Sequence, residues 1–181
     1  MTTIEDVLGF WFAPGREKAW FERDAAFDRA VQIALGRGHA AAAAGALSGW
    51  QGSARGCLAL CLLLDQVPRN LFRDDPRAFA TDAQALAVAR DALARGFDRS
   101  MTQVERSFLY LPLEHSEDLA DQEDCCRLMA TLDERPEWHD YALRHRDIIA
   151  RFGRFPHRNK VLGRASTAEE LAFLQEPDSS F

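Results

Sequence analysis

Three short segments concentrate the residues that could bind a ligand or transfer a proton, and each contains a proline close to apolar residues. Arginine carries a planar guanidinium that can hold a carboxylate or phosphate through two parallel hydrogen bonds. Histidine titrates near neutral pH and can serve as a general acid or base. We call these segments the first, second and third polar corners: LDQVPRN (64–70), PLEHSED (112–118) and RFGRFPHRN (151–159).

Because proline restricts the backbone at each corner, the polar side chains are expected to project from a rigid base. If acidic side chains of the second corner met basic ones of the third, several arginines would be left to bind an anion. The corners therefore predict a pocket for a small anionic metabolite, with His115 and His157 as candidate catalytic residues in an enzyme such as a hydrolase. The candidate ligand-binding residues are Asp65, Arg69, Asn70, Glu117, Arg151, Arg154, Arg158 and Asn159.

The polar corners could instead be structural, or could belong to a peptide-binding surface. Helix ends leave backbone carbonyl and amide groups unpaired, and Arg, Asn and Asp side chains can satisfy them. Substituting Asp65 or Asn159 would then lower stability without changing any binding event. Alternatively, stacked helix hairpins offer grooves that bind peptides or proteins. Arginines that line an open groove would favour a peptide partner, whereas arginines that converge in a closed pocket would favour a small molecule.

Motifs for the common nucleophiles, nucleotides and metals are missing. The sequence has no GxSxG, no P-loop and no GxGxxG in a strand–turn–helix context. His115, Glu117 and His157 could ligate a metal, but no HExxH or paired-cysteine spacing supports this. We therefore predict no metal and no cofactor.

The cysteines are expected to be reduced residues of the core. Cys57 and Cys61 lie one helical turn apart within an apolar run, and Cys125 and Cys126 are adjacent. Adjacent cysteines on one helix point in different directions, so they do not easily serve one tetrahedral metal site.

Composition favours one soluble domain spanning residues 1–181. The chain has 181 residues, of which 47% are hydrophobic and 28% charged, enough for one sizeable core. Its formal net charge of -6 argues against binding to nucleic acid or to an anionic membrane. The longest apolar run, which begins at Cys57, is about half as long as a bilayer crossing requires, and Glu5 and Asp6 are unlike the start of a signal peptide. We expect a cytoplasmic protein.

Helical periodicity runs through nearly the whole chain, which predicts an all-α fold of about nine helices stacked as antiparallel hairpins. Glycines 36 and 38 are expected to close the second helix, Pro68 to turn the chain, Pro112 to interrupt a helix, and Ser116 to cap the next one. Thr102 with Glu105 and Thr167 with Glu170 have capping-box spacing. His139 and His145 are expected to be partly exposed. The first expected helix follows Thr3. The next three cover about residues 27–35, 39–49 and 53–64. The remaining five begin at Asp75, Thr102, Ser116, Pro136 and Thr167.

The sequence resembles a bacterial family known as domain of unknown function 924. The resemblance rests on blocks that follow in order along almost the whole chain: LGFWF (8–12), LLLDQVPRNLFR (62–73), AFATDAQAL (78–86), FLYLPLEHSEDLADQE (108–123), RFGRFPHRNKVLGR (151–164) and STAEELAFL (166–174). Val67 departs from the pattern, which has phenylalanine there. The resemblance implies a tetratricopeptide-like all-α fold. It implies no established reaction, and no catalytic residues carry over from it.

Overall fold

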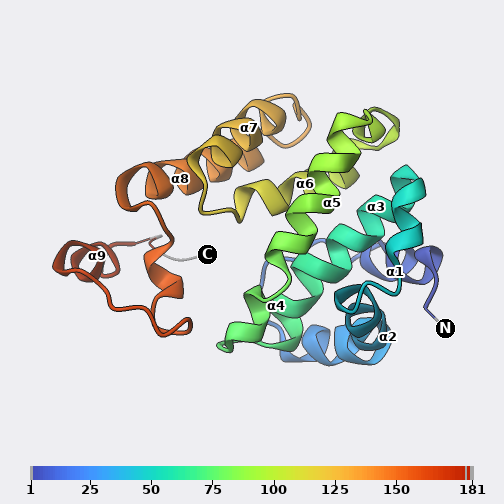
Figure 1. Ribbon diagram of the computed structural model, residues 1–181, viewed down its shortest axis with the longest axis horizontal. Helices are drawn as coiled ribbons and strands as arrows, with labels where there is room; N and C mark the ends of the chain where they lie inside the picture. Colours follow the sequence, from blue (N-terminus) through green and yellow to red (C-terminus); the bar gives the residue numbers. More distant parts are fainter. Residues whose placement is uncertain (1, 178, 180–181) are drawn as a thin grey trace. The chain divides into compact units, whose positions relative to one another are not determined.

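The computed structural model describes residues 2–177 and 179, and this part of the chain is helical without any β-strand (Figure 1). The all-α prediction is confirmed, and the number of helices is close to the predicted nine. The α-helices are α1 (Ile4–Trp11), α2 (Ala25–Ala43), α3 (Ala54–Cys61), α4 (Val67–Leu71), α5 (Asp82–Ala94), α6 (Gln103–Glu114), α7 (Leu119–Met129), α8 (Pro136–Phe152) and α9 (Ala168–Phe173). Short helical turns are η1 (Ser48–Gly52), η2 (Leu62–Gln66), η3 (Pro76–Phe79), η4 (Phe97–Ser100) and η5 (Pro156–Arg158).

The described residues divide into two compact units. Unit 1 comprises residues 2–73 and 77–112, and unit 2 comprises residues 74–76 and the described residues from 113 onward. Each unit has its own buried apolar residues. The assignment of residues 1–181 to a single domain stays a prediction.

Unit 1 is built around the helical stretch of α3, in which every residue from Gly56 to Cys61 is buried. An aromatic cluster supports one side of this core. Trp11 is fully buried and packs edge-on against Phe108, and the indole N–H of Trp20 donates to the backbone oxygen of Trp11 at 2.9 Å. Both tryptophans are therefore core residues, and the N–H of Trp20 has the partner that a buried indole requires.

Unit 2 contains the antiparallel pair α7 and α8, which lie side by side in Figure 1. Helix α8 ends at Gly153, whose φ of 68° is the left-handed conformation that glycine adopts without a Cβ clash. Phe155, Ile148 and Ile149 form a buried apolar cluster beside this end. Helix α9 begins with the predicted capping box of Thr167 and Glu170. The other predicted box, of Thr102 and Glu105, is also present.

Two expectations about glycine and alanine are wrong. Helix α2 continues through glycines 36 and 38 to Ala43, so the alanine-rich stretch is its last part and not a separate helix. Glycine lowers helix stability by roughly 1 kcal/mol relative to alanine, but tertiary packing overrides this propensity. A Cβ at Gly38 would lie 3.1 Å from Leu63 Cδ2, so the glycine allows close contact with the core.

The prolines also act differently from the expectation. Pro68 does not turn the chain, because it occupies the first turn of α4, where its missing N–H is tolerated. Pro112 lies inside α6, which continues to Glu114. Pro76 opens only the short turn η3, and the next α-helix begins at Asp82. Asp118, not Ser116, caps α7 by accepting from the N–H of Ala120 at 2.9 Å.

Candidate functional site

The first polar corner lies in unit 1, where η2 is a π-helical segment that leads directly into α4. The N–H of Val67 donates to the oxygen of Leu62, five residues earlier. Pro68 has no backbone N–H to donate. A donor at this position would bind the backbone oxygen of Leu63 in a π-helix, or that of Leu64 in an α-helix. Both of these carbonyls accept side-chain hydrogen bonds instead.

The two donors come from other elements of unit 1. His39 Nδ1 of α2 lies 2.8 Å from the oxygen of Leu63, and a carbonyl can only accept, so this nitrogen carries the hydrogen. The hydroxyl of Thr81 donates to the oxygen of Leu64. Both side chains are buried. Backbone groups buried without partners are costly, so His39 and Thr81 stabilise the helix around the proline.

The charged residues of the first corner contact one another and their neighbours. Arg69 Nη1 lies 3.3 Å from a carboxylate oxygen of Asp65, which is 1% exposed, and the guanidinium donates two hydrogen bonds to Asp82 at 2.9 and 3.0 Å. Burial lowers the pKa of Arg69, but Asp65 and Asp82 outweigh it and raise that pKa. Asn70 instead donates to Asp28 at 2.8 Å.

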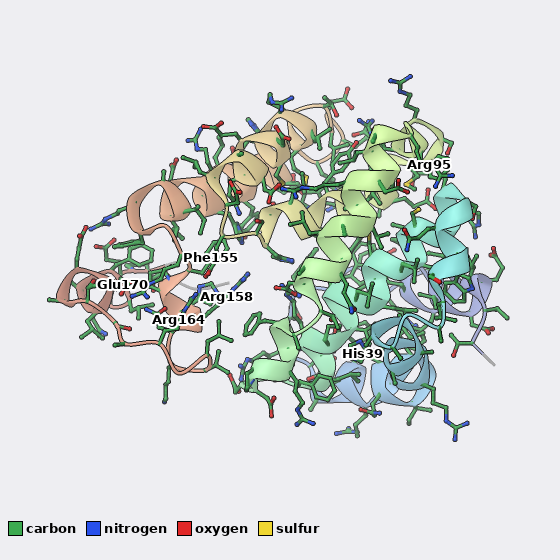
Figure 2. All side chains as sticks on the ribbon, in the orientation of Figure 1. His39, Arg95, Phe155, Arg158, Arg164 and Glu170 are labelled. Carbon is green, nitrogen blue, oxygen red and sulfur yellow. The ribbon has the colours of Figure 1, made fainter. Side chains whose placement is uncertain are left out.

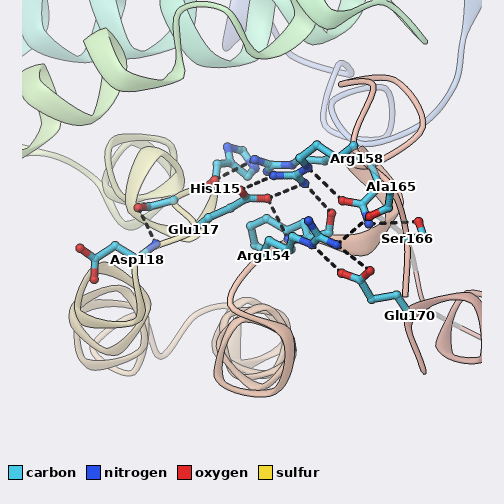
Figure 3. Close-up of polar contacts among 12 residues, drawn as sticks. His115, Glu117, Asp118, Arg154, Arg158, Ala165, Ser166 and Glu170 are labelled. Atoms are coloured by element: carbon cyan, nitrogen blue, oxygen red, sulfur yellow. Dashed lines mark hydrogen bonds and ion pairs between the residues drawn. The ribbon is translucent and has the colours of Figure 1, made fainter. Parts of the chain in front are cut away.

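The second and third polar corners meet within unit 2 (Figure 3). A carboxylate oxygen of Glu117 accepts from the N–H of Phe155 at 2.8 Å, and the carboxylate pairs with Arg164 at 2.6 and 2.9 Å. Burial would raise the pKa of Glu117, but the hydrogen bonds from Arg164 and Phe155 lower it overall. Arg158 Nη1 donates to the oxygen of His115 at 3.0 Å. Convergence of all three corners on one hollow stays a prediction.

Two arginines of the third corner pair with acidic residues of α9. Arg154 donates two hydrogen bonds to Glu170 at 2.6 and 2.8 Å and one to the oxygen of Ala165 at 2.9 Å. The bonds from Arg154 lower the pKa of Glu170 to about 2. Arg151 donates to Glu169 at 2.9 Å, with both side chains exposed. The sequence predicts that these arginines are available for an anion, whereas the structure gives each a carboxylate partner.

Arg164 is a residue of this site that is not among the candidates predicted from the sequence. Besides its pair with Glu117, it donates from Nε to the side-chain oxygen of Asn159 at 2.9 Å. Asn159 is fully buried and donates from its amide to Ser166 at 3.1 Å. Arg164 lies five residues beyond the corner, within the RNKVLGR block, and only its position after a glycine distinguishes it in the sequence.

Three further polar side chains of unit 2 pack on the ring of Phe155, which is fully buried, and a fourth lies beside one of them. The Cζ of Arg158 lies 4.4 Å from the centre of this ring, and the rings of His145 and His157 each lie 5.6 Å from it. The ring of His115 is 6.4 Å from that of His145. We call His115, His145, His157 and Arg158 the histidine–arginine cluster; Figure 2 labels Arg158 beside Phe155.

Burial and positive neighbours keep two of these imidazoles neutral at pH 7. Burial lowers the pKa of His157 to about 4, and the nearby Arg158 and His115 contribute to this shift. Burial likewise lowers the pKa of His145 to about 3. His145 was expected to be partly exposed, but it is 5% exposed because its ring packs on Phe155, whereas His139 is partly exposed as predicted.

Glu114 is a second residue outside the predicted candidates. It is buried, with one carboxylate oxygen 3.7 Å from His145 Nδ1 and the other 3.9 Å from the Sγ of Cys125. His145 Nδ1 also donates to the oxygen of Tyr141 at 2.9 Å, so Nδ1 carries the hydrogen.

All four cysteines are buried thiols, as predicted for core residues. Burial raises the pKa of each thiol, and that of Cys125 lies well above its ordinary value. A protonated thiol is a poor nucleophile.

The described residues contain no group of three or more His, Cys, Asp or Glu side chains placed to hold a metal ion. Within the same residues, none of the helices combines the length and apolar character needed to cross a membrane.

Comparison with known proteins places the chain in a family. Among solved structures, it matches a protein of unknown function from Agrobacterium tumefaciens with a TM-score of 0.87 and 42% sequence identity. The match covers 95% of this chain and 96% of that one. A search of curated proteins gives no match. The model of a family described as bacterial protein of unknown function (DUF924) matches residues 7–178. The chain therefore belongs to the DUF924 family.

Proposed function

We propose that unit 2 binds a small anionic metabolite at the histidine–arginine cluster. The observation that carries the proposal is the packing of a buried guanidinium and two imidazoles on the ring of Phe155, with a third imidazole, that of His115, beside the ring of His145. Arg158 is 6% exposed, while His115 and His157 are partly exposed and provide access from solvent. Arginine and imidazole N–H groups are suitable donors to carboxylate and phosphate oxygens.

The electrostatics of the cluster support an anion over a cation. The positive charges of Arg158, His115 and Arg164 all lower the pKa of His157, and of the groups that shift it Glu117 acts in the opposite direction. Burial is the largest cause of the lowered pKa of His157, and the part of the shift that comes from the neighbouring cations reflects a positive potential, which favours a bound anion. Because Arg158 is buried, the arrangement favours a small ligand over a peptide lying in an open groove.

The predicted residues have different roles in this proposal. Arg158 and His157 would contact the anion, and His115 or His157 would be available for proton transfer if the protein is an enzyme. Glu117, Arg154 and Asn159 would hold the third corner in place through the contacts described above. Asp65, Arg69 and Asn70 stay predicted ligand residues, and their contacts in unit 1 favour a structural role.

Thermal-shift screening of phosphorylated and carboxylated metabolites, followed by calorimetry on any hit, tests the proposal. Arg158→Gln and His157→Asn should each weaken binding of the hit by at least roughly tenfold, as expected for loss of a charge-assisted hydrogen bond. Arg127→Gln is the matched control, since this exposed arginine of α7 pairs with Asp124 and is not among the candidate residues, and it should leave affinity within roughly twofold. Unchanged affinity in folded Arg158→Gln protein would show that the ligand binds elsewhere.

A further inference from the structure

We infer that, if unit 2 binds an anion as proposed above, His157 takes up a proton from solvent as the anion binds. The ligand would then lie between two cations, the guanidinium of Arg158 and the imidazolium of His157. The inference rests on the proposed function and adds to it the ligand's charge class and a dependence of affinity on pH.

The geometry places these two groups on one support. His157 and Arg158 are consecutive in η5, and both pack on the ring of Phe155, at 5.6 and 4.4 Å from its centre. Arg158 is fixed further by its hydrogen bond to the oxygen of His115. Side chains so close together can contact the same small ligand.

The charged and titratable groups around His157 come from every neighbouring part of unit 2. Those that disfavour its protonation are Arg158 of the same turn, His115 after α6 and Arg164 after η5. His145 of α8 also faces it, and a positive charge on His157 lowers the pKa of His145. Glu117 favours protonation, but its carboxylate already pairs with Arg164 and accepts from the N–H of Phe155.

A bound anion changes this balance. In the free protein the pKa of His157 is about 4, so the imidazole is neutral at pH 7. An anion within contact distance favours the charged form and raises the pKa of His157. Between pH 4 and this raised pKa, the complex holds one more proton than the free protein and anion. Affinity therefore increases as the pH falls, by up to about tenfold for each pH unit.

The two neighbouring cations also indicate the class of ligand. They match a group that carries two negative charges and several acceptor oxygens, such as a phosphate monoester or a dicarboxylate. A single carboxylate would neutralise only one of them. We therefore expect dianions to bind more tightly than monoanions of similar size.

Calorimetry with inorganic sulfate tests proton uptake, because sulfate keeps its two charges from pH 5 to pH 8 and any pH dependence then comes from the protein. We expect the Kd for sulfate to be at least roughly tenfold lower at pH 5.5 than at pH 7.5. Titrations near pH 6 in buffers of different ionisation enthalpy should show uptake of up to one proton per sulfate. The acetate monoanion should bind more weakly than sulfate at each pH.

Matched histidine variants identify the group that is protonated. His157→Asn should lose most of the pH dependence of sulfate affinity, whereas His139→Asn, which changes a partly exposed histidine of α8, should behave like the unchanged protein. Sulfate binding with the same Kd at pH 5.5 and 7.5, or an unchanged pH dependence in folded His157→Asn, would overturn the proton uptake alone. No sulfate binding at any pH would overturn the proposed function as well.

Discussion

In unit 1, the polar side chains near Pro68 donate to carbonyls that the proline leaves without a helical donor, or pair with one another. In unit 2, those near Pro156 include a buried arginine and two histidines that pack on one aromatic ring, with a third histidine beside them. Residue types beside the two prolines are similar, yet their surroundings differ. Polar side chains support the backbone in both regions, since Arg158 donates to the oxygen of His115. What distinguishes unit 2 is that a guanidinium and two imidazoles pack on one buried aromatic ring, an arrangement that residue types at a helix end do not reveal.

The difference can be tested first at Asp65, where we expect the largest effect. This carboxylate is 1% exposed, accepts from Gln66 at 2.6 Å and lies beside Arg69. Asp65→Ala removes the acceptor of the buried Gln66 amide and one of the two carboxylates beside Arg69, and should lower the free energy of unfolding by about 3 kcal/mol, measured by urea denaturation. Asp91→Ala removes an exposed carboxylate that pairs with Arg95 and should cost about 0.5 kcal/mol or less. Equal losses in the two variants would mean that the first corner does not hold unit 1 together.

The second-largest effect is expected in acid, which should lower the stability of unit 2 more than that of unit 1. His145 has a pKa of about 3 in the folded protein and about 6.5 when unfolded. Between these pH values the unfolded chain binds a proton that the folded chain does not, so stability falls as the pH falls from 6.5 toward 3. At pH 5 the loss from His145 alone should be about 2 kcal/mol.

Hydrogen exchange at pH 7 and pH 5, corrected for the intrinsic rates, measures this difference. Amides of α7 and α8 should lose more protection than those of α2 and α3. His145→Gln, whose side chain does not titrate, should reduce the pH dependence. Equal loss of protection in α3 and α8 would contradict a role for buried histidines of unit 2.

Some features set by residues close in the sequence were predictable, although the cap of α7 at Asp118 and the continuation of α2 through glycines 36 and 38 were not. The capping boxes of Thr102 with Glu105 and Thr167 with Glu170 span three residues, and both are present because each involves a single helix end. The left-handed end at Gly153 and the all-α fold follow equally from local pattern.

Features that depend on partners distant in the sequence were not predictable. Arg154 finds Glu170 16 residues away, and Arg164 finds Glu117 47 residues away, so no spacing rule could assign the arginines to their acids. The π-helical segment was not predictable either, because its one-residue shift in hydrogen bonding leaves the apolar run unchanged. Pro68 therefore predicts a turn, whereas in the structure its missing N–H is compensated by His39 and Thr81.

Thr81→Val tests that compensation and should have the smallest of these effects. Valine is close to threonine in shape but cannot donate, so the oxygen of Leu64 would be buried without its side-chain donor. We expect the free energy of unfolding to fall by about 1.5 kcal/mol. Thr81→Ser keeps the hydroxyl and should recover part of the loss.

Ser100→Ala is the control, because the exposed hydroxyl of Ser100 donates to the oxygen of Phe97 at 2.9 Å and water can replace it. If urea denaturation gave the same small change for Thr81→Val and Ser100→Ala, the carbonyls beside Pro68 would not need side-chain donors, and the contrast between the two units would lose its physical basis.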